Sequence, residues 1–261
     1  MDTLIQLDFL DLGIALGMMA IAIGISAWQQ LGLEGNLALA TARTVVQLVV
    51  VGMLVLEVIF TWENPLALAG LLAIMLSIAA IVARNRISTK IPKLLPLVWF
   101  SILVSSGLTL LYTNFLVLRQ PDIWGNPQYL IPLAGIVMGN AMNGAALAGE
   151  RFVSSIQASP LEIETHLCLG ATPKQAISQY RKDAVRSGLI PTINSMMVVG
   201  LVTLPGIMTG QMLSGINPIY AAAYQILIMF MLAFANLIAT LLITQGLANK
   251  FFNSAAQLER F

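Results

Sequence analysis

Apolar runs of roughly 20 residues, separated by short polar segments, constrain the fold of this chain more than any other feature. A bilayer core about 30 Å thick needs roughly 20 apolar residues for each crossing helix. The seven runs of suitable length are Leu12–Trp28, Thr41–Phe60, Leu66–Ala83, Leu95–Phe115, Leu130–Ala148, Leu189–Leu204 and Ala221–Gly246. They lack the alternation of membrane β-strands, so the sequence predicts an all-α, polytopic membrane protein with about seven transmembrane helices.

Composition excludes several other classes of protein. Of the 261 residues, 58% are hydrophobic and 10% are charged, whereas a soluble domain has about 25% charged residues. A soluble enzyme and a disordered chain are therefore excluded. The net charge of +1 provides no field for a polyanion, so no nucleic-acid partner is expected. One cysteine and one histidine exclude a disulfide framework within the chain and a four-ligand Cys/His zinc site.

The distribution of basic residues predicts the orientation. With the N-terminus outside, every Lys and Arg except Arg119 falls on the cytoplasmic side, as the positive-inside rule requires. The sequence therefore predicts an N-out, C-in layout and a single transmembrane domain over residues 1–261. The first run is not expected to be a cleaved signal peptide, because residues 1–11 contain no Lys or Arg. The sixth run is short, and we expect Pro191 to break it.

A cytoplasmic segment from about residue 150 to 188 is too long for a plain connection between helices 5 and 6. Ser159–Glu162 has the pattern of a capping box with proline at the first helical position. Gly170 is a candidate left-handed C-cap, and Thr172–Gln175 repeats the start signal. A second, basic amphipathic helix is expected to carry Ala176, Ile177, Tyr180 and Ala184 on one face and to enter the membrane near Gly188.

Two interpretations of this helical hairpin remain open. It can lie on the anionic inner leaflet through its Lys and Arg side chains. Alternatively, it can insert into a groove of a soluble partner. Two capped helices with a glycine between them favour the docking interpretation, because a surface anchor needs only one helix.

Several blocks of the sequence resemble those of a known family. Residues Glu162–Pro173, followed by Leu189-Ile190-Pro191, resemble the coupling loop of ABC-transporter permeases. Other blocks resemble one narrower family, which comprises the bacterial iron-export permease and the plant aluminium-sensitivity permease. These blocks are Arg43–Leu48, Met138–Gly144, Glu150–Phe152 and Leu204–Gly215. The resemblance covers almost the whole chain in the same order.

The resemblance implies a permease subunit rather than an enzyme, located in the plasma membrane (the bacterial inner membrane) and crossing it several times. It implies export of iron or a related metal species, a partner ABC ATPase, and a permease homodimer surrounded by membrane lipid. No lysine follows a glycine, so the chain has no phosphate loop. ATP and Mg are therefore expected on the partner, with no cofactor in this chain. The residues that the resemblance assigns to ATPase coupling are Glu162, Glu164, His166, Gly170, Ala171, Thr172 and Pro173.

Alternatives to iron export remain. The chain can be an ABC permease for a nucleotide sugar or another metabolite, a secondary transporter or channel that acts alone, or a membrane scaffold. A secondary transporter is expected to carry an Asp, Glu or His near mid-membrane, and the apolar runs have almost none. This scarcity argues against that class.

Neutral polar residues are the main candidates for a translocation path or gate. Asn140 and Asn143 fall on one helical face, where they can either line a path or bond across packed helices. The segment around Pro205 and Gly206 is either a re-entrant gate or an ordinary loop. The full candidate set is Arg43, Gln47, Asn140, Asn143, Glu150, Arg151, Met208, Thr209 and Gln211.

No metal ligands can be assigned from the sequence. The 13 methionines suit either core packing or soft copper(I). His166 and Cys168 lie two residues apart on a predicted helix and point in nearly opposite directions, so they cannot share one ion. The substrate stays open at this level.

Overall fold

The structure is a computed structural model, and it describes residues 8–61, 65–119, 126–253 and 256–259. The chain packs into two compact units, Met1–Glu63 and Asn64–Phe261, which are described separately below. The regular structure in the described ranges is helical, so the all-α prediction is confirmed. The single permease domain over residues 1–261 and the N-out, C-in orientation stay predictions.

The first unit is a pair of helices, α1 (Phe9–Trp28) and α2 (Glu34–Thr61), joined by a tight turn. In that turn the Leu31 N–H donates to the Ser26 carbonyl at 3.0 Å, and Gly32 has a φ of +69°. The buried Ser26 hydroxyl donates to the Glu34 carboxylate at 3.1 Å. Apolar side chains are exposed along both helices, as a lipid environment permits because lipid tails are as apolar as leucine.

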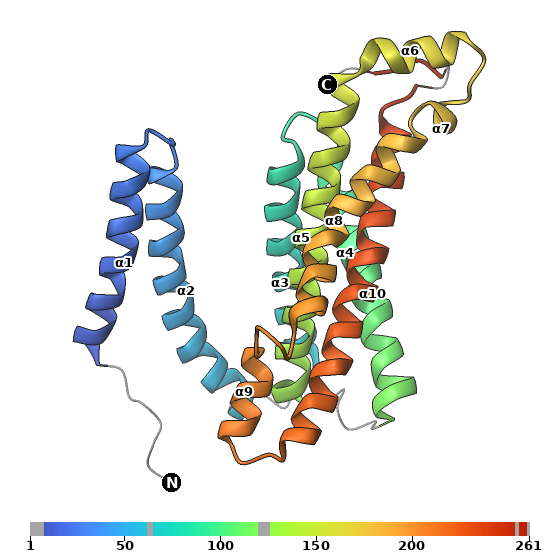
Figure 1. The fold of residues 1–261 in the computed structure, drawn as a ribbon. Coiled ribbons are helices and arrows are strands. Elements are labelled where there is room, and N and C mark those ends of the chain that lie inside the picture. Colours follow the sequence, from blue (N-terminus) through green and yellow to red (C-terminus); the bar gives the residue numbers. More distant parts are fainter. Residues whose placement is uncertain (1–7, 62–64, 120–125, 254–255, 260–261) are drawn as a thin grey trace. The chain divides into compact units, whose positions relative to one another are not determined.

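The second unit is a helical bundle built around α5 (Pro127–Ala158) and α10 (Pro218–Lys250). Helix α5 packs against α3 (Pro65–Ile87), α8 (Ser178–Val198) and α10, and α10 also contacts α4 (Leu94–Tyr112) and α8. A π-helical segment, η1 (Thr113–Leu118), extends α4. Figure 1 shows α6 (Pro160–Cys168) lying across one end of this bundle, with the one-turn α7 (Pro173–Ala176) nearby and α9 (Gly206–Leu213) at the opposite end.

Basic side chains gather at the end of the bundle where α6 lies. This end collects the last turn of α3, the α3–α4 connection, the C-terminal ends of α5 and α10, and the first half of α8. Those elements carry Arg84, Arg86, Lys90, Lys93, Arg151, Arg181, Lys182, Arg186 and Lys250, and the nearby α7 carries Lys174, whereas Arg119 follows η1 at the other end. The division agrees with the charge asymmetry used to predict orientation.

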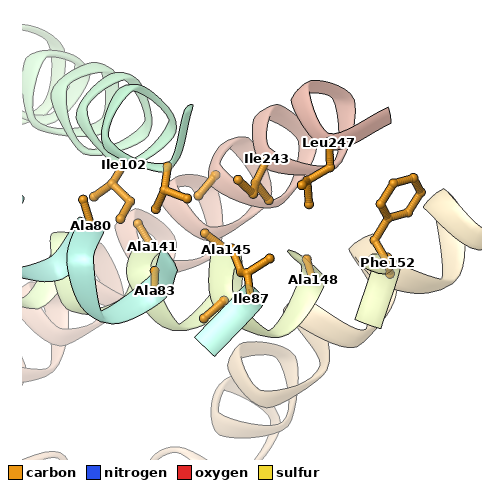
Figure 2. Packing of buried hydrophobic residues seen from close by; sticks show 14 of the residues in the cluster. Ala80, Ala83, Ile87, Ile102, Ala141, Ala145, Ala148, Phe152, Ile243 and Leu247 are labelled. Atoms are coloured by element: carbon orange, nitrogen blue, oxygen red, sulfur yellow. The ribbon is translucent and has the colours of Figure 1, made fainter. Parts of the chain in front are cut away.

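The core of the second unit is rich in alanine, which lets the helices approach closely. Ala141, Ala145 and Ala148 of α5 are fully buried, and Figure 2 shows them among Ile87 of α3 and Ile243 of α10. At the basic end the core is closed by an edge-to-face pair, Phe152 and Phe251, whose ring centroids lie 6.0 Å apart. This compact core holds α5, α8 and α10 together around the site described next.

The number of apolar spans differs from the sequence prediction. Six helices in the described ranges are long and apolar enough to cross a membrane, namely α1, α2, α3, α4 with η1, α5 and α10. The predicted sixth span, Leu189–Leu204, begins inside α8 and runs past its end at Val198. Helix α8 starts earlier, at Ser178, and the charged residues in its first half make it too polar to be counted among these six helices. It nevertheless packs along α5 and α10.

The expected break at Pro191 is also absent. Pro191 lies inside α8, which continues to Val198. A proline inside a helix removes one backbone hydrogen bond, but α8 contacts two neighbouring helices over its length. The packing of α8 stabilises the helix by more than the missing hydrogen bond destabilises it.

Candidate functional site

Residues 159–177, called the elbow segment here, occupy the basic end of the bundle (Figure 1). Helix α6 ends in a Schellman motif, in which the N–H groups of Gly170 and Ala171 donate to the carbonyls of Leu167 and His166, both at 3.0 Å. Gly170 has a φ of +90°, and a Cβ there would meet no other atom within 4 Å. Glycine is required by the backbone rather than by space, so the predicted left-handed C-cap is confirmed.

The two predicted helix starts in the elbow segment have different outcomes. Thr172 and Gln175 form the predicted capping box: the Gln175 N–H donates to Thr172 Oγ1 at 3.3 Å, and the Thr172 N–H donates to Gln175 Oε1 at 2.9 Å. Ser159 makes no capping hydrogen bond, so the capping box predicted there is wrong. This serine ends α5 and begins α6, with φ and ψ of −127° and 44° rather than the extended geometry of an N-cap.

The predicted second helix of the elbow is interrupted at Ile177, which separates α7 from α8. The predicted apolar face is nevertheless present, with Ala176, Ile177 and Ala184 buried and Tyr180 half-buried. Burial raises the pKa of Tyr180, and the nearby Glu162 carboxylate adds to the rise, so this phenol stays neutral. The chain does not enter a new helix near Gly188, because α8 runs continuously through that residue.

The elbow segment has three buried residues, Ile163, Ala176 and Ile177, and its other residues are exposed or half-buried. Ile163 is fully buried, whereas Leu161 and Leu169 are 76% and 79% exposed. Among the predicted coupling residues, Glu162, His166, Gly170 and Thr172 are exposed, and Glu164, Ala171 and Pro173 are half-buried. Large exposed apolar side chains next to polar ones are typical of a protein-binding surface.

A polar cavity of about 240 Å³ lies between α5, α8 and α10. Asn140 and Asn143 both line it, so the predicted shared face is confirmed, and Thr192 of α8 lies opposite them. The Asn140 Nδ2 donates to the Leu232 carbonyl at 3.0 Å and to Thr192 Oγ1 at 3.4 Å. Asn140 therefore links all three helices, while Asn143 is exposed.

The wall of the cavity is closed by a third carboxamide, Asn236 of α10. Asn236 is 2% exposed, and its Nδ2 donates to the Gly188 carbonyl at 3.1 Å and to Thr192 Oγ1 at 2.7 Å. A Cβ at Gly144 would collide with the Asn236 side chain, and a Cβ at Gly188 would come within 2.8 Å of the Gly144 carbonyl. Glycine at both positions therefore creates the three-helix junction of Gly144, Gly188, Thr192 and Asn236.

Within the second unit, the predicted path residues Glu150 and Arg151 do not line this cavity. Glu150 forms an ion pair with Arg86 of α3 at 3.0 Å, and Arg86, not Glu150, lines the cavity. Arg151 is exposed near the end of α5. Arg43 and Gln47 are exposed on α2, in the first unit.

The predicted gate residues lie on α9, a short helix that starts after Pro205. Met208, Thr209 and Gln211 are all half-buried there. The Thr209 hydroxyl donates to the Pro205 carbonyl at 3.1 Å, and Gln211 Oε1 is buried with no hydrogen-bond partner in the described chain. A gating role for this segment stays a prediction.

The sequence analysis did not single out Thr192, Arg86 or Asn236 as lining this cavity. It also missed a buried row of hydroxyl side chains, Ser101, Ser105 and Thr109 on α4 and Thr113 at the start of η1. Their spacing of four residues was a visible signal, because such positions share one helical face. Several of these hydroxyls bond to carbonyls of their own helix, for example Thr109 to Ser105 at 2.7 Å, so the row permits close helix packing.

The chemistry of the cavity is that of hydrogen bonding rather than metal chelation. Its polar lining combines carboxamides and hydroxyls with the Arg86 guanidinium, and it includes no carboxylate from the described residues. Across the residues that the structure describes, no group of three or more His, Cys, Asp or Glu side chains is placed to hold a metal ion. The cavity can hold a polar or anionic group more readily than a dehydrated cation.

Comparison with known proteins identifies a family that matches this chain. Residues 9–252 match a family described as an uncharacterised protein family, UPF0014. The chain is 51% identical over 255 residues to the UPF0014 membrane protein slr1647 of Synechocystis, covering 98% of each chain. It is 35% identical over 252 residues to the probable iron export permease protein FetB of Escherichia coli, covering 95% of this chain and 93% of that one.

A plant relative extends the comparison. The chain is 34% identical over 245 residues to the protein ALUMINUM SENSITIVE 3 of Arabidopsis thaliana, covering 94% of this chain and 88% of the relative. No solved structure matches. The resemblance inferred from the sequence blocks is confirmed by these relatives. The chain is a multi-pass membrane protein that belongs to the UPF0014 family, together with a relative named as a probable iron export permease.

Proposed function

We propose that this chain is the permease subunit of an ABC transporter that exports iron or a related metal species across the plasma membrane, driven by a separate ATPase. The name of the Escherichia coli relative supports a transport role. The observation that carries the proposal is the elbow segment, a capped helical hairpin at the basic end of the bundle. It exposes Leu161 and Leu169 while Ile163 fixes it to the core.

In this proposal the elbow segment receives the motion of the ATPase. ATP and Mg²⁺ bind the partner, because this sequence has no phosphate loop. Closure of the ATPase dimer displaces α6, and the displacement passes to α5 through Ser159 and to α8 through α7. Both long helices line the polar cavity, so a change in their separation alters access to it. Two permease chains and two ATPases form the expected complex.

A second candidate is an ABC permease for a polar metabolite such as a nucleotide sugar. One observation favours it, namely that the cavity offers carboxamides and the Arg86 guanidinium but no carboxylate. Such a lining suits phosphate and hydroxyl groups better than a bare cation. Iron can still be the cargo if it is carried as an anionic complex.

Co-expression with the ATPase encoded nearest to this gene tests the proposal. We expect the two chains to co-purify and to hydrolyse ATP in a vanadate-sensitive manner. Replacing both exposed leucines of the elbow, Leu161→Glu and Leu169→Glu, is expected to abolish co-purification while the permease remains in the membrane. The matched control is Leu201→Glu, since Leu201 is 88% exposed in the loop that follows α8 at the opposite end of the bundle.

The outcomes separate the candidate functions. ATP hydrolysis stimulated by iron species supports iron export, and stimulation by nucleotide sugars supports the second candidate. A chain that transports in proteoliposomes without any ATPase is a secondary transporter or channel. Equal co-purification by the elbow variant and the control contradicts the proposed ATPase docking.

A further inference from the structure

A groove of about 490 Å³ on the outer face of α8 has a composition that the proposed transport function does not use. Four basic side chains line it, Lys174, Arg181, Lys182 and Arg186, together with Ser178. Its remaining lining is aliphatic: Val185, Leu189 and Ile193 of α8 with Leu241 of α10. No acidic residue lines the groove in the part of the chain that the structure describes.

Apart from Val185, the charged and aliphatic residues of the groove are separated along the helix axis. The cations lie on α7 and the first half of α8, and Leu189 and Ile193 follow them along α8. The seven residue steps from Arg186 to Ile193 span about 10 Å at 1.5 Å per residue, which reaches well into one leaflet of a bilayer. The groove is therefore positive at the basic end of the bundle and apolar at membrane depth.

The orientation of individual side chains supports a preformed site. Arg181 is half-buried, and its Nε donates to Thr244 Oγ1 of α10 at 3.5 Å, which turns the guanidinium toward the neighbouring helix. Asp183, the acidic residue of this helix, accepts hydrogen bonds from Gln179 at 3.2 and 3.3 Å, and neither residue lines the groove. The positive charge of the groove thus has no carboxylate facing it.

We propose that this groove binds one anionic phospholipid, with its phosphate among Lys174, Arg181, Lys182 and Arg186 and one acyl chain along Leu189, Ile193 and Leu241. Charge complementarity selects an anion, and the aliphatic half selects an amphiphile rather than a soluble phosphate. Basic pockets between transmembrane helices on the cytoplasmic side are known to suit anionic headgroups. The occupied groove fixes α8 at the membrane surface.

Native mass spectrometry of the full chain in neutral detergent tests the site. The probes are phosphatidylglycerol and phosphatidylcholine with the same acyl chains. We expect preferential retention of phosphatidylglycerol and a loss of about tenfold in its affinity in the Lys182→Gln/Arg186→Gln variant. The charge-matched control is Lys90→Gln/Arg151→Gln, whose residues are exposed at the same end but outside the groove; it should retain the lipid. Equal losses in both variants overturn the proposal in favour of general attraction.

Two further measurements keep the test independent of variant folding. A phosphatidylglycerol with a photoreactive acyl chain should label the unmodified protein at Leu189, Ile193 or Leu241, and labelling spread evenly over other helices overturns the site. Glycerol phosphate at the same concentration should not displace the lipid. If glycerol phosphate displaces the bound lipid as effectively as added phosphatidylglycerol does, the groove is assigned to a soluble phosphate ligand instead.

Discussion

The three-helix junction and the elbow segment both depend on glycine, but for opposite physical reasons. At the junction, Gly144 and Gly188 have ordinary helical backbones, and the space for a side chain is already filled by neighbouring groups. In the elbow, Gly170 has open space around it and a backbone conformation that side chains disfavour. The first kind of glycine sets the distance between helices, whereas the second sets the direction of a turn. Substitution should therefore damage stability at the junction and coupling at the elbow.

Gly188→Ala is expected to have the largest effect on stability. The new Cβ would lie 2.8 Å from the Gly144 carbonyl and 2.7 Å from the Thr240 side chain, and a backbone carbonyl cannot rotate away. We expect a destabilisation of about 3 kcal/mol, near the upper limit for overpacking, measured by thermal unfolding in detergent. The control is Gly139→Ala on α5, where a Cβ meets nothing within 4 Å. An equal loss in both variants would contradict the close-approach explanation.

The hydrogen bonds of Asn236 should give the next largest effect. Asn236→Ala removes the donors to the Gly188 carbonyl and to Thr192 Oγ1, each worth roughly 1 kcal/mol. A double-mutant cycle with Thr192→Ala, followed by thermal unfolding, isolates the second bond. We expect a coupling free energy of about 1 kcal/mol between the two positions. Strictly additive effects would mean that this contact contributes nothing to the junction.

Gly170→Ala tests the difference between the elbow and the junction. We expect it to lower the stability of the permease only slightly and to reduce its coupling to the ATPase strongly. Forcing a side chain into the left-handed conformation costs about 1 kcal/mol. The readout is ATPase stimulation in the reconstituted complex, compared with the melting temperature of the permease. Gly215→Ala is the matched control, since its φ of +84° is similar and its surroundings are equally open. Similar losses of stimulation in both variants would remove the special role of the elbow.

The Arg86–Glu150 ion pair is expected to have the smallest effect. Both side chains are about half exposed, and such pairs contribute about 0.2–1 kcal/mol. Arg86→Gln should lower the melting temperature slightly in low salt and not at all in high salt, where the charges are screened. Exchanging the two residues, Arg86→Glu with Glu150→Arg, should restore part of the loss. A large, salt-independent effect would instead indicate a role of Arg86 in the cavity.

Local patterns in the sequence were sufficient to predict individual helix ends and helix faces, but not the contacts between helices. The glycine C-cap at Gly170 and the capping box at Thr172 depend on residues within a few positions, so both could be predicted. The shared face of Asn140 and Asn143 followed from helical spacing alone. By contrast, Asn236 meets Gly188 across 48 residues of sequence. No periodicity encodes such a pairing.

The sequence predictions that proved wrong share a cause. Helix α8 begins in a charged stretch and ends in an apolar one, so hydropathy alone divided one helix between a cytoplasmic segment and a membrane span. The capping box at Ser159 was predicted from its residue types, but the preceding helix extends to Ala158 and constrains the serine backbone. In both cases a neighbouring element decided the local geometry.

That single serine between α5 and α6 has a mechanical consequence. Ser159 is the single residue between the nine-residue α6 and the 32-residue α5. Only one pair of backbone torsion angles is therefore available to absorb a rotation of α6 relative to α5. Helix α5 is about 48 Å long at 1.5 Å per residue, and a tilt of roughly 5° at its C-terminus carries its far end through about 4 Å. The arrangement works as a lever, in which a small push on the short arm is amplified at the opposite face of the bilayer.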